Sequence, residues 1–205
     1  MRQSPIVYFL FFISGITALI YEIVWTRMLT LVFGHTVFSV SVVLAAFMAG
    51  LGLGSYLFGY AIDRLPETSA SKSLLVYGWV EILIFASGAL LSLLFANFSG
   101  IYASLHSVLP ESIPLQNLIK MVFAFGLILV PATLMGATLP IISKYCVTDD
   151  SRIGTQVSLL YALNTLGAAS GCLLAGFFLM GTFGVLQTVL LAAGANLLIG
   201  IGALN

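Results

Sequence analysis

Charge is what this sequence lacks most. Only 7% of its 205 residues are charged, whereas about a quarter are charged in an ordinary soluble domain. The net charge is zero and no basic run occurs, which removes the electrostatic attraction on which nucleic-acid-binding proteins depend. Hydrophobic residues make up 60% of the chain instead. We therefore expect an integral membrane protein that lies in a lipid bilayer and binds no nucleic acid.

Cysteine and catalytic motifs are also scarce. The two cysteines, Cys146 and Cys172, form no CxxC pair and are expected at different membrane depths, so neither a disulfide nor a metal site is indicated. The chain has no GxSxG, HExxH or P-loop motif, and the glycine-rich run at 50–54 does not match GxGxxG. We predict no metal, no cofactor and no catalytic residue in this chain.

Six apolar stretches are each long enough to cross the hydrocarbon core of a bilayer, which takes ~20 helical residues. Little room remains for a soluble domain. The predicted fold class is therefore all-α, a single domain of six transmembrane helices. The expected spans are 5–33, 37–62, 73–97, 115–143, 155–180 and 185–204.

The distribution of Lys and Arg predicts the orientation in the membrane. Most of them lie at the N-terminus and in the loops after spans two and four, which share one side of the membrane. By the positive-inside rule this side is cytoplasmic, so both termini are expected inside the cell. These residues are Arg2, Arg64, Lys72, Lys144 and Arg152.

A shift of the sequence by 117 positions places three glycines of span two on three glycines of span five, and it also places Arg27 on Lys144. This match indicates an internal repeat. Span one then corresponds to span four and span two to span five, the inverted 3+3 arrangement found within each half of major facilitator transporters. A chance match between glycine-rich spans is the alternative. In either case small residues on one helix face favour close helix packing. The matched glycines are Gly50, Gly54 and Gly59 with Gly167, Gly171 and Gly176.

Span four contains Pro131 and Pro140, and each removes a backbone donor. A kink is expected at each proline. The prolines leave the carbonyls of Leu127 and Gly136 without their usual partners, and Thr133 and Thr138 are the expected replacement donors. The span is either a bent packing helix or a helix that lines a cavity.

Glu22 is the most unusual residue of the first span. Counting ~1.5 Å per residue from position 5 places it ~25 Å into the span, with Arg27 ~7 Å further on. Five residues turn a helix by about 140°, so these two do not form an intrahelical ion pair, which needs a spacing of three or four. We expect Glu22 to pair with Lys120 of span four or to bind a cation.

Glu81 is a second acid at membrane depth, in span three, Asn164 lies at a comparable depth in span five, and Asn196 lies in span six. Such residues usually face the bundle interior or a wet cavity, so each is a candidate site. The predicted substrate-binding set is Glu22, Glu81, Asn164, Tyr21 and Trp25. The alternatives are a structural role, as ties between helices, and a cation-binding or proton-coupled role.

Four blocks of the sequence resemble the membrane part of the bacterial spermidine-synthase-like membrane proteins, also described as fused major facilitator/spermidine synthase proteins. The resemblance covers nearly the whole chain in the same order. The blocks are SGITALIYEIVWTRML, VLAAFMAGLGLGSYLFGYAIDR, PATLMGATLPIISK and LLYALNTLGAASGCLLAGFFL.

This resemblance implies a membrane module of a polyamine-related system in the bacterial inner membrane. In that family a cytosolic aminopropyltransferase-like domain follows the helices, and the present sequence ends at Asn205. We expect a separate cytosolic spermidine-synthase-like partner or a domain that has been lost or removed, and assembly as a homodimer or with another membrane subunit. The alternative functions are a half-size transporter for an unrelated solute and a non-transporting structural subunit.

Overall fold

The computed structural model describes residues 5–34, 36–64, 70–98, 100, 112–147, 151 and 153–205. The helices are α1 (Pro5–Phe33), α2 (Thr36–Asp63), α3 (Ala70–Ala96), α5 (Ile113–Cys146), α6 (Ile153–Leu174), α7 (Met180–Phe183) and α8 (Val185–Leu204). A π-helical turn, Ala175–Leu179, continues α6 into the short α7.

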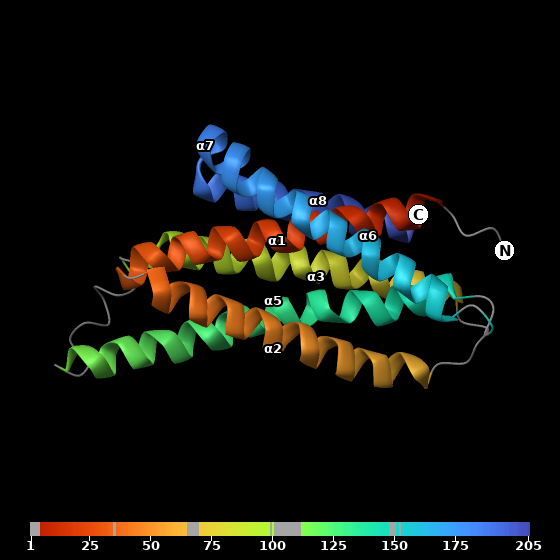
Figure 1. Ribbon diagram of the computed structural model, residues 1–205, viewed down its shortest axis with the longest axis horizontal. Helices are drawn as coiled ribbons and strands as arrows, with labels where there is room; N and C mark the ends of the chain where they lie inside the picture. Colours follow the sequence, from red (N-terminus) through yellow and green to blue (C-terminus); the bar gives the residue numbers. More distant parts are fainter. Residues whose placement is uncertain are drawn as a thin grey trace.

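Six helical segments in this part of the chain are long and apolar enough to cross a membrane, with α6, the π-helical turn and α7 forming the fifth. Their ends differ from the predicted ranges by at most three residues. The structure thus confirms the six-helix, all-α membrane fold. α1 begins and α8 ends at the same end of the bundle (Figure 1). Arg2 and Arg152, two of the cations behind the predicted orientation, lie outside the described residues.

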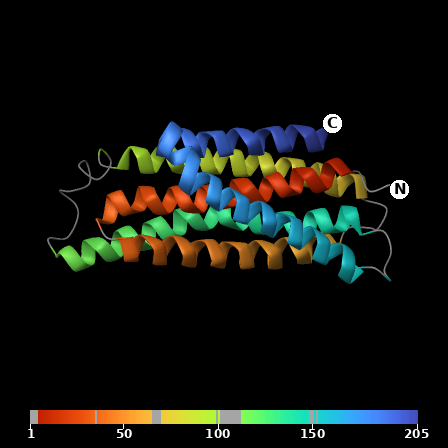
Figure 2. The same cartoon turned by 45° about the horizontal axis from the view of Figure 1, so that its top comes forward.

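Each helix packs against a small set of neighbours (Figures 1 and 2). The most extensive pairings are α2 with α5, α1 with α6, and α3 with α8. Smaller ones join α3 to α5, α1 to α8, and α1 to α2. The core therefore lies along α1, α3 and α5, whereas α6 crosses the outside of α1.

The glycines of α2 allow it to approach α5 closely. A Cβ atom at Gly50 would stand 2.9 Å from the Ala132 carbonyl carbon, and one at Gly54 would overlap the carbonyl oxygen of Thr133. Gly59 is looser, because its nearest neighbour is 3.9 Å away. Two of the three predicted packing positions on α2 thus lie at a backbone contact.

The same arrangement recurs where α6 crosses α1. A Cβ atom at Gly167 would overlap the carbonyl oxygen of Phe12, and one at Gly171 would overlap that of Ile16. Gly176, in the π-helical turn, has no such neighbour within 4 Å. Van der Waals contact between backbones holds helices together in lipid, where no hydrophobic drive acts between them.

α5 continues as one helix through its internal prolines. The carbonyl of Gly136, which Pro140 deprives of its usual donor, accepts a hydrogen bond from the Ser55 hydroxyl of α2 at 3.0 Å. Thr133 and Thr138 were the expected donors, but their hydroxyls bond the carbonyls of Leu129 and Met135 in their own helix. The replacement donor therefore comes from the neighbouring helix, which links α2 to α5 by a polar contact as well.

Candidate functional site

Glu81 lies at the centre of the bundle, where α1, α3 and α8 meet. Its side chain on α3 is completely buried. One carboxyl oxygen accepts a hydrogen bond from the Ser14 hydroxyl of α1 at 2.6 Å. The other accepts one from the Asn196 amide of α8, also at 2.6 Å. Two neutral donors from different helices therefore hold the carboxyl group, and both bonds are at the short end of the usual range.

Five buried polar atoms of the described residues have no hydrogen-bond partner, among them the Tyr21 and Tyr77 hydroxyls and the Asn196 side-chain oxygen. Tyr77 stands one helical turn before Glu81, and its hydroxyl interacts with the carboxyl group without meeting the geometry of a hydrogen bond. Leaving such an atom unsatisfied costs about 1–3 kcal/mol. The cluster of Glu81, Ser14, Asn196 and Tyr77 therefore retains unused hydrogen-bonding and ligating capacity.

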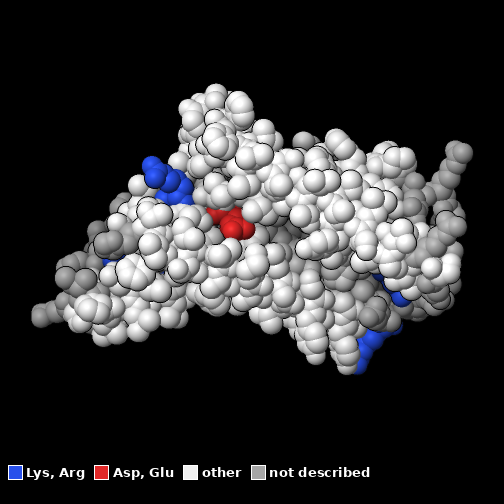
Figure 3. Space-filling view, in the orientation of Figure 1, with Lys and Arg blue, Asp and Glu red and all other residues white. Residues whose placement is uncertain are grey.

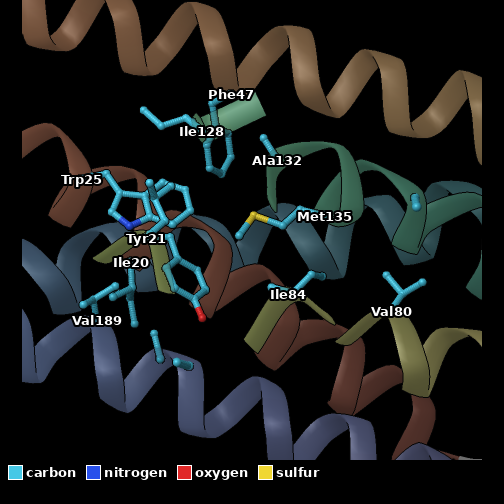
Figure 4. Packing of buried hydrophobic residues seen from close by; sticks show 14 of the residues in the cluster. Ile20, Tyr21, Trp25, Phe47, Val80, Ile84, Ile128, Ala132, Met135 and Val189 are labelled. Carbon is cyan, nitrogen blue, oxygen red and sulfur yellow. The ribbon is translucent and has the colours of Figure 1, made fainter. Parts of the chain in front are cut away.

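A second polar contact joins α1 to α3 further along the bundle. The Trp25 indole donates to the Ser92 hydroxyl at 3.0 Å, and that hydroxyl donates to the Gly88 carbonyl at 2.7 Å. The Ser14–Glu81 and Trp25–Ser92 pairs are both 67 residues apart, so the two helices run parallel in one register. Figure 4 shows the Tyr21 ring beside Trp25, with the Tyr21 hydroxyl pointing away from the indole.

Glu22 lies elsewhere, partly exposed on the surface of α1. The Thr26 hydroxyl bonds its backbone carbonyl at 2.8 Å. Among the described residues no ion pair joins Glu22 to Lys120 or to Arg27. Lys120 lines an apolar cavity of about 430 Å³ with Met28 and other residues at the end of the bundle where α1 and α3 finish.

Asn164 sits at the crossing of α6 and α1. Its amide donates to the Phe11 carbonyl at 3.1 Å, beside Gly15. Of the predicted substrate-binding residues, Glu81 alone lies in this cluster, whereas the Tyr21 ring lies against Gly88, about two helical turns further along α3. Trp25 joins Ser92 instead, and Glu22 and Asn164 lie apart.

Ser14 and Tyr77 are the members of the cluster that the sequence analysis missed. A signal for each exists. Ser14, Thr17 and Tyr21 follow a spacing of three and four, which puts three polar groups on one face of an apolar helix. Tyr77 precedes Glu81 by four residues, the spacing of neighbours on a helix surface.

No family model, curated protein or solved structure matches this chain. The resemblance to the spermidine-synthase-like membrane proteins therefore stays a prediction.

Proposed function

We propose that the chain is a membrane-embedded module that binds a small cation inside its helix bundle, with Glu81 as the acidic contact. The observation that carries this proposal is a fully buried carboxyl group held only by neutral donors. An unpaired charge at low dielectric is costly, and a bound cation or proton removes that cost. The surrounding oxygens of Ser14, Asn196 and Tyr77 supply the additional ligands that a dehydrated cation needs.

The scaffold we propose is the inverted 3+3 repeat, half of a major facilitator. The helix pairs support it: if span one corresponds to span four, two to five and three to six, α2 with α5 becomes α6 with α1, and α3 with α5 becomes α8 with α1. All four of these helix pairs are in direct contact, and each pair is matched by its counterpart in the other half.

Individual contacts support the same repeat. Gly54 approaches the carbonyl oxygen of Thr133, and a shift of 117 positions turns this pair into Gly171 and Ile16, whose carbonyl oxygen Gly171 approaches in the same way. The backbone nitrogens of Thr133 and Ile16 take equivalent places against Gly50 and Gly167, at 3.0 and 3.3 Å from the added Cβ atoms. A chance match of glycines has no reason to reproduce these atoms.

A polyamine as the cation, and a cytosolic spermidine-synthase-like protein as the partner, rest on the sequence resemblance. A terminal ammonium group fits an acidic site as well as a metal cation does, so polyamines belong in the binding assay. The partner proposal is tested separately, by purifying the chain with its native partners and identifying any cytosolic protein that accompanies it. Recovery of the chain without such a protein contradicts this part of the proposal.

The experiment on the site compares Glu81→Gln with Glu22→Gln in the same lipid nanodiscs. Glutamine at position 81 can still accept from Ser14, and its amide can donate to the unpartnered oxygen of Asn196, so we expect assembly to survive. Binding of sodium, potassium and labelled di- and polyamines should fall at least tenfold in Glu81→Gln and stay unchanged in Glu22→Gln. Equal binding by wild type and Glu81→Gln contradicts the proposal.

A structural tie is the second candidate, favoured by the contact between Trp25 and Ser92, which joins the same two helices without a charge. Under this alternative, Glu81→Gln binds every cation as the wild type does, and Glu81→Ala unfolds in milder conditions. Uptake into vesicles that contain only this chain then separates transport from binding. No accumulation or exchange of any cation that binds would contradict a transport role.

A further inference from the structure

The outer half of α1 carries a second pattern, separate from the Glu81 cluster. Its buried side consists of residues such as Tyr21, Val24 and Met28, which pack into the bundle. A different stripe on the same helix stays only partly buried. It consists of Leu19, Ile23, Thr26 and Thr30, spaced by four, three and four.

This spacing is that of the a and d positions of a heptad, the seam along which two helices pair. The hydroxyls of Thr26 and Thr30 bond backbone carbonyls of their own helix, at 2.8 Å in each case. No unsatisfied hydroxyl therefore opposes contact with another helix. Threonine is among the small residues that line helix interfaces in membranes.

The rest of the chain covers the stripe only in part, because α6 crosses α1 at positions 12–16, before the stripe begins, and only a smaller contact with the π-helical turn follows. Beyond the crossing, α6 and α7 lean away from α1 (Figures 1 and 2). Glu22 flanks the stripe on one side and is partly exposed, and Arg27 flanks it on the other and is exposed. Figure 3 shows an acidic patch and a basic patch close together on one face of the molecule.

We propose that a second copy of this chain covers the stripe, with α1 packed parallel to its counterpart and Glu22 of each copy paired with Arg27 of the other. If the stripe occupies positions a and d, Glu22 falls at g and Arg27 at e of the next heptad. In parallel helix pairs these flanking positions form the interhelical ion pairs. Glu22 and Arg27 are five residues apart, which prevents an ion pair within one helix. The same spacing is the one that a g-to-e ion pair between two parallel helices requires.

The charges favour a second copy over another protein. The chain itself supplies an acid and a base at matching positions, and a two-fold axis along the membrane normal brings each onto the other twice. Both copies then have the same orientation in the membrane, as parallel helices require. Pairing also covers a carboxylate that would otherwise face lipid at a depth where charge is expensive.

The first test is cysteine crosslinking of the full chain in bilayers, in a Cys146→Ser, Cys172→Ala background. Thr26→Cys lies in the stripe and should form disulfide-linked dimers under mild oxidation. Leu31→Cys is 70% exposed but lies about 140° from Thr26 around the helix, and it should remain largely monomeric. Equal crosslinking of the two variants overturns the proposed face, and a chain that stays monomeric at every protein-to-lipid ratio overturns the second copy.

The second test measures the dimer dissociation constant by energy transfer between labelled copies in liposomes. Glu22→Arg and Arg27→Glu each place like charges opposite one another, so each should weaken association about tenfold or more. The double variant exchanges the charges and should restore it. A double variant as weak as the single ones, or single variants as strong as the wild type, contradicts the ion pair even if the chain is a dimer. The result is independent of cation binding at Glu81.

Discussion

Replacing Gly52 or Gly54 of α2 by alanine should change the stability of the fold in opposite directions. A Cβ atom at Gly54 would overlap the Thr133 carbonyl oxygen and stand 2.9 Å from the Ala137 backbone nitrogen. Gly52 lies on the opposite face of α2, and nothing lies within 4 Å of a Cβ atom added there. Gly54→Ala therefore pushes α2 and α5 apart at the most extensive helix contact of the bundle, whereas Gly52→Ala adds a methyl group to open space.

The two magnitudes follow from this geometry. Alanine is favoured over glycine in a helix by about 0.5–1 kcal/mol, so Gly52→Ala should stabilise the fold by that amount. Gly54→Ala gains the same term but loses about 1–3 kcal/mol through overpacking against backbone that cannot rotate away. We expect a net destabilisation of up to about 2.5 kcal/mol for Gly54→Ala, and a difference between the two variants equal to the overpacking term, about 1–3 kcal/mol.

The assay is reversible unfolding in mixed micelles, followed by the helical circular dichroism signal as the denaturing detergent increases. Gly59→Ala is the matched control, because its nearest neighbour at 3.9 Å is an ordinary contact. It should behave like Gly52→Ala. If Gly52→Ala and Gly54→Ala shift the unfolding free energy in the same direction by similar amounts, the inferred close approach of α2 and α5 is wrong.

Three further predictions concern other helices. Gly171→Ala should destabilise the fold as much as Gly54→Ala, within about 1 kcal/mol, because the two glycines contact equivalent carbonyls; a neutral Gly171→Ala would count against the inverted repeat. Trp25→Phe and Ser92→Ala should show a coupling of about 1 kcal/mol in a double-mutant cycle, and simple additivity would show that their 3.0 Å hydrogen bond contributes nothing. Gly184→Ala should lower the unfolding temperature, because φ is +83° and ψ is 171° there and a side chain costs about 1–3 kcal/mol in that region; an unchanged unfolding temperature would contradict this backbone conformation at Gly184.

The six helices could be predicted from the sequence because hydrocarbon requires long apolar segments, and length alone identifies them. The sequence could not predict which face of each helix is buried. A helix that is apolar all round gives no amphipathic period to show the inward side. Glu22 and Glu81 therefore looked equivalent as acids at membrane depth, whereas the packing buries Glu81 completely and leaves Glu22 partly exposed.

The partners of the site were beyond the sequence for a different reason. Ser14 and Asn196 are 67 and 115 residues from Glu81, and nothing local links them to it. The same holds for Ser55, which replaces Thr138 as the donor to Gly136 because α2 approaches α5 so closely. Local spacing could identify which carbonyl Pro140 frees, but only the tertiary fold determines which side chain reaches it.

The distribution of the Glu81 partners along the chain bears on how the protein is made. Ser14 is synthesised before Glu81, so this bond can form as soon as the third helix enters the membrane. Asn196 follows Glu81 by 115 residues, which at about 5–20 residues per second means a delay of roughly 6–23 s. During that interval the carboxyl group has at most one of its two donors, and α8 supplies the second. A chain that stops before Asn196 therefore leaves the Glu81 carboxyl group one hydrogen-bond donor short inside the bundle.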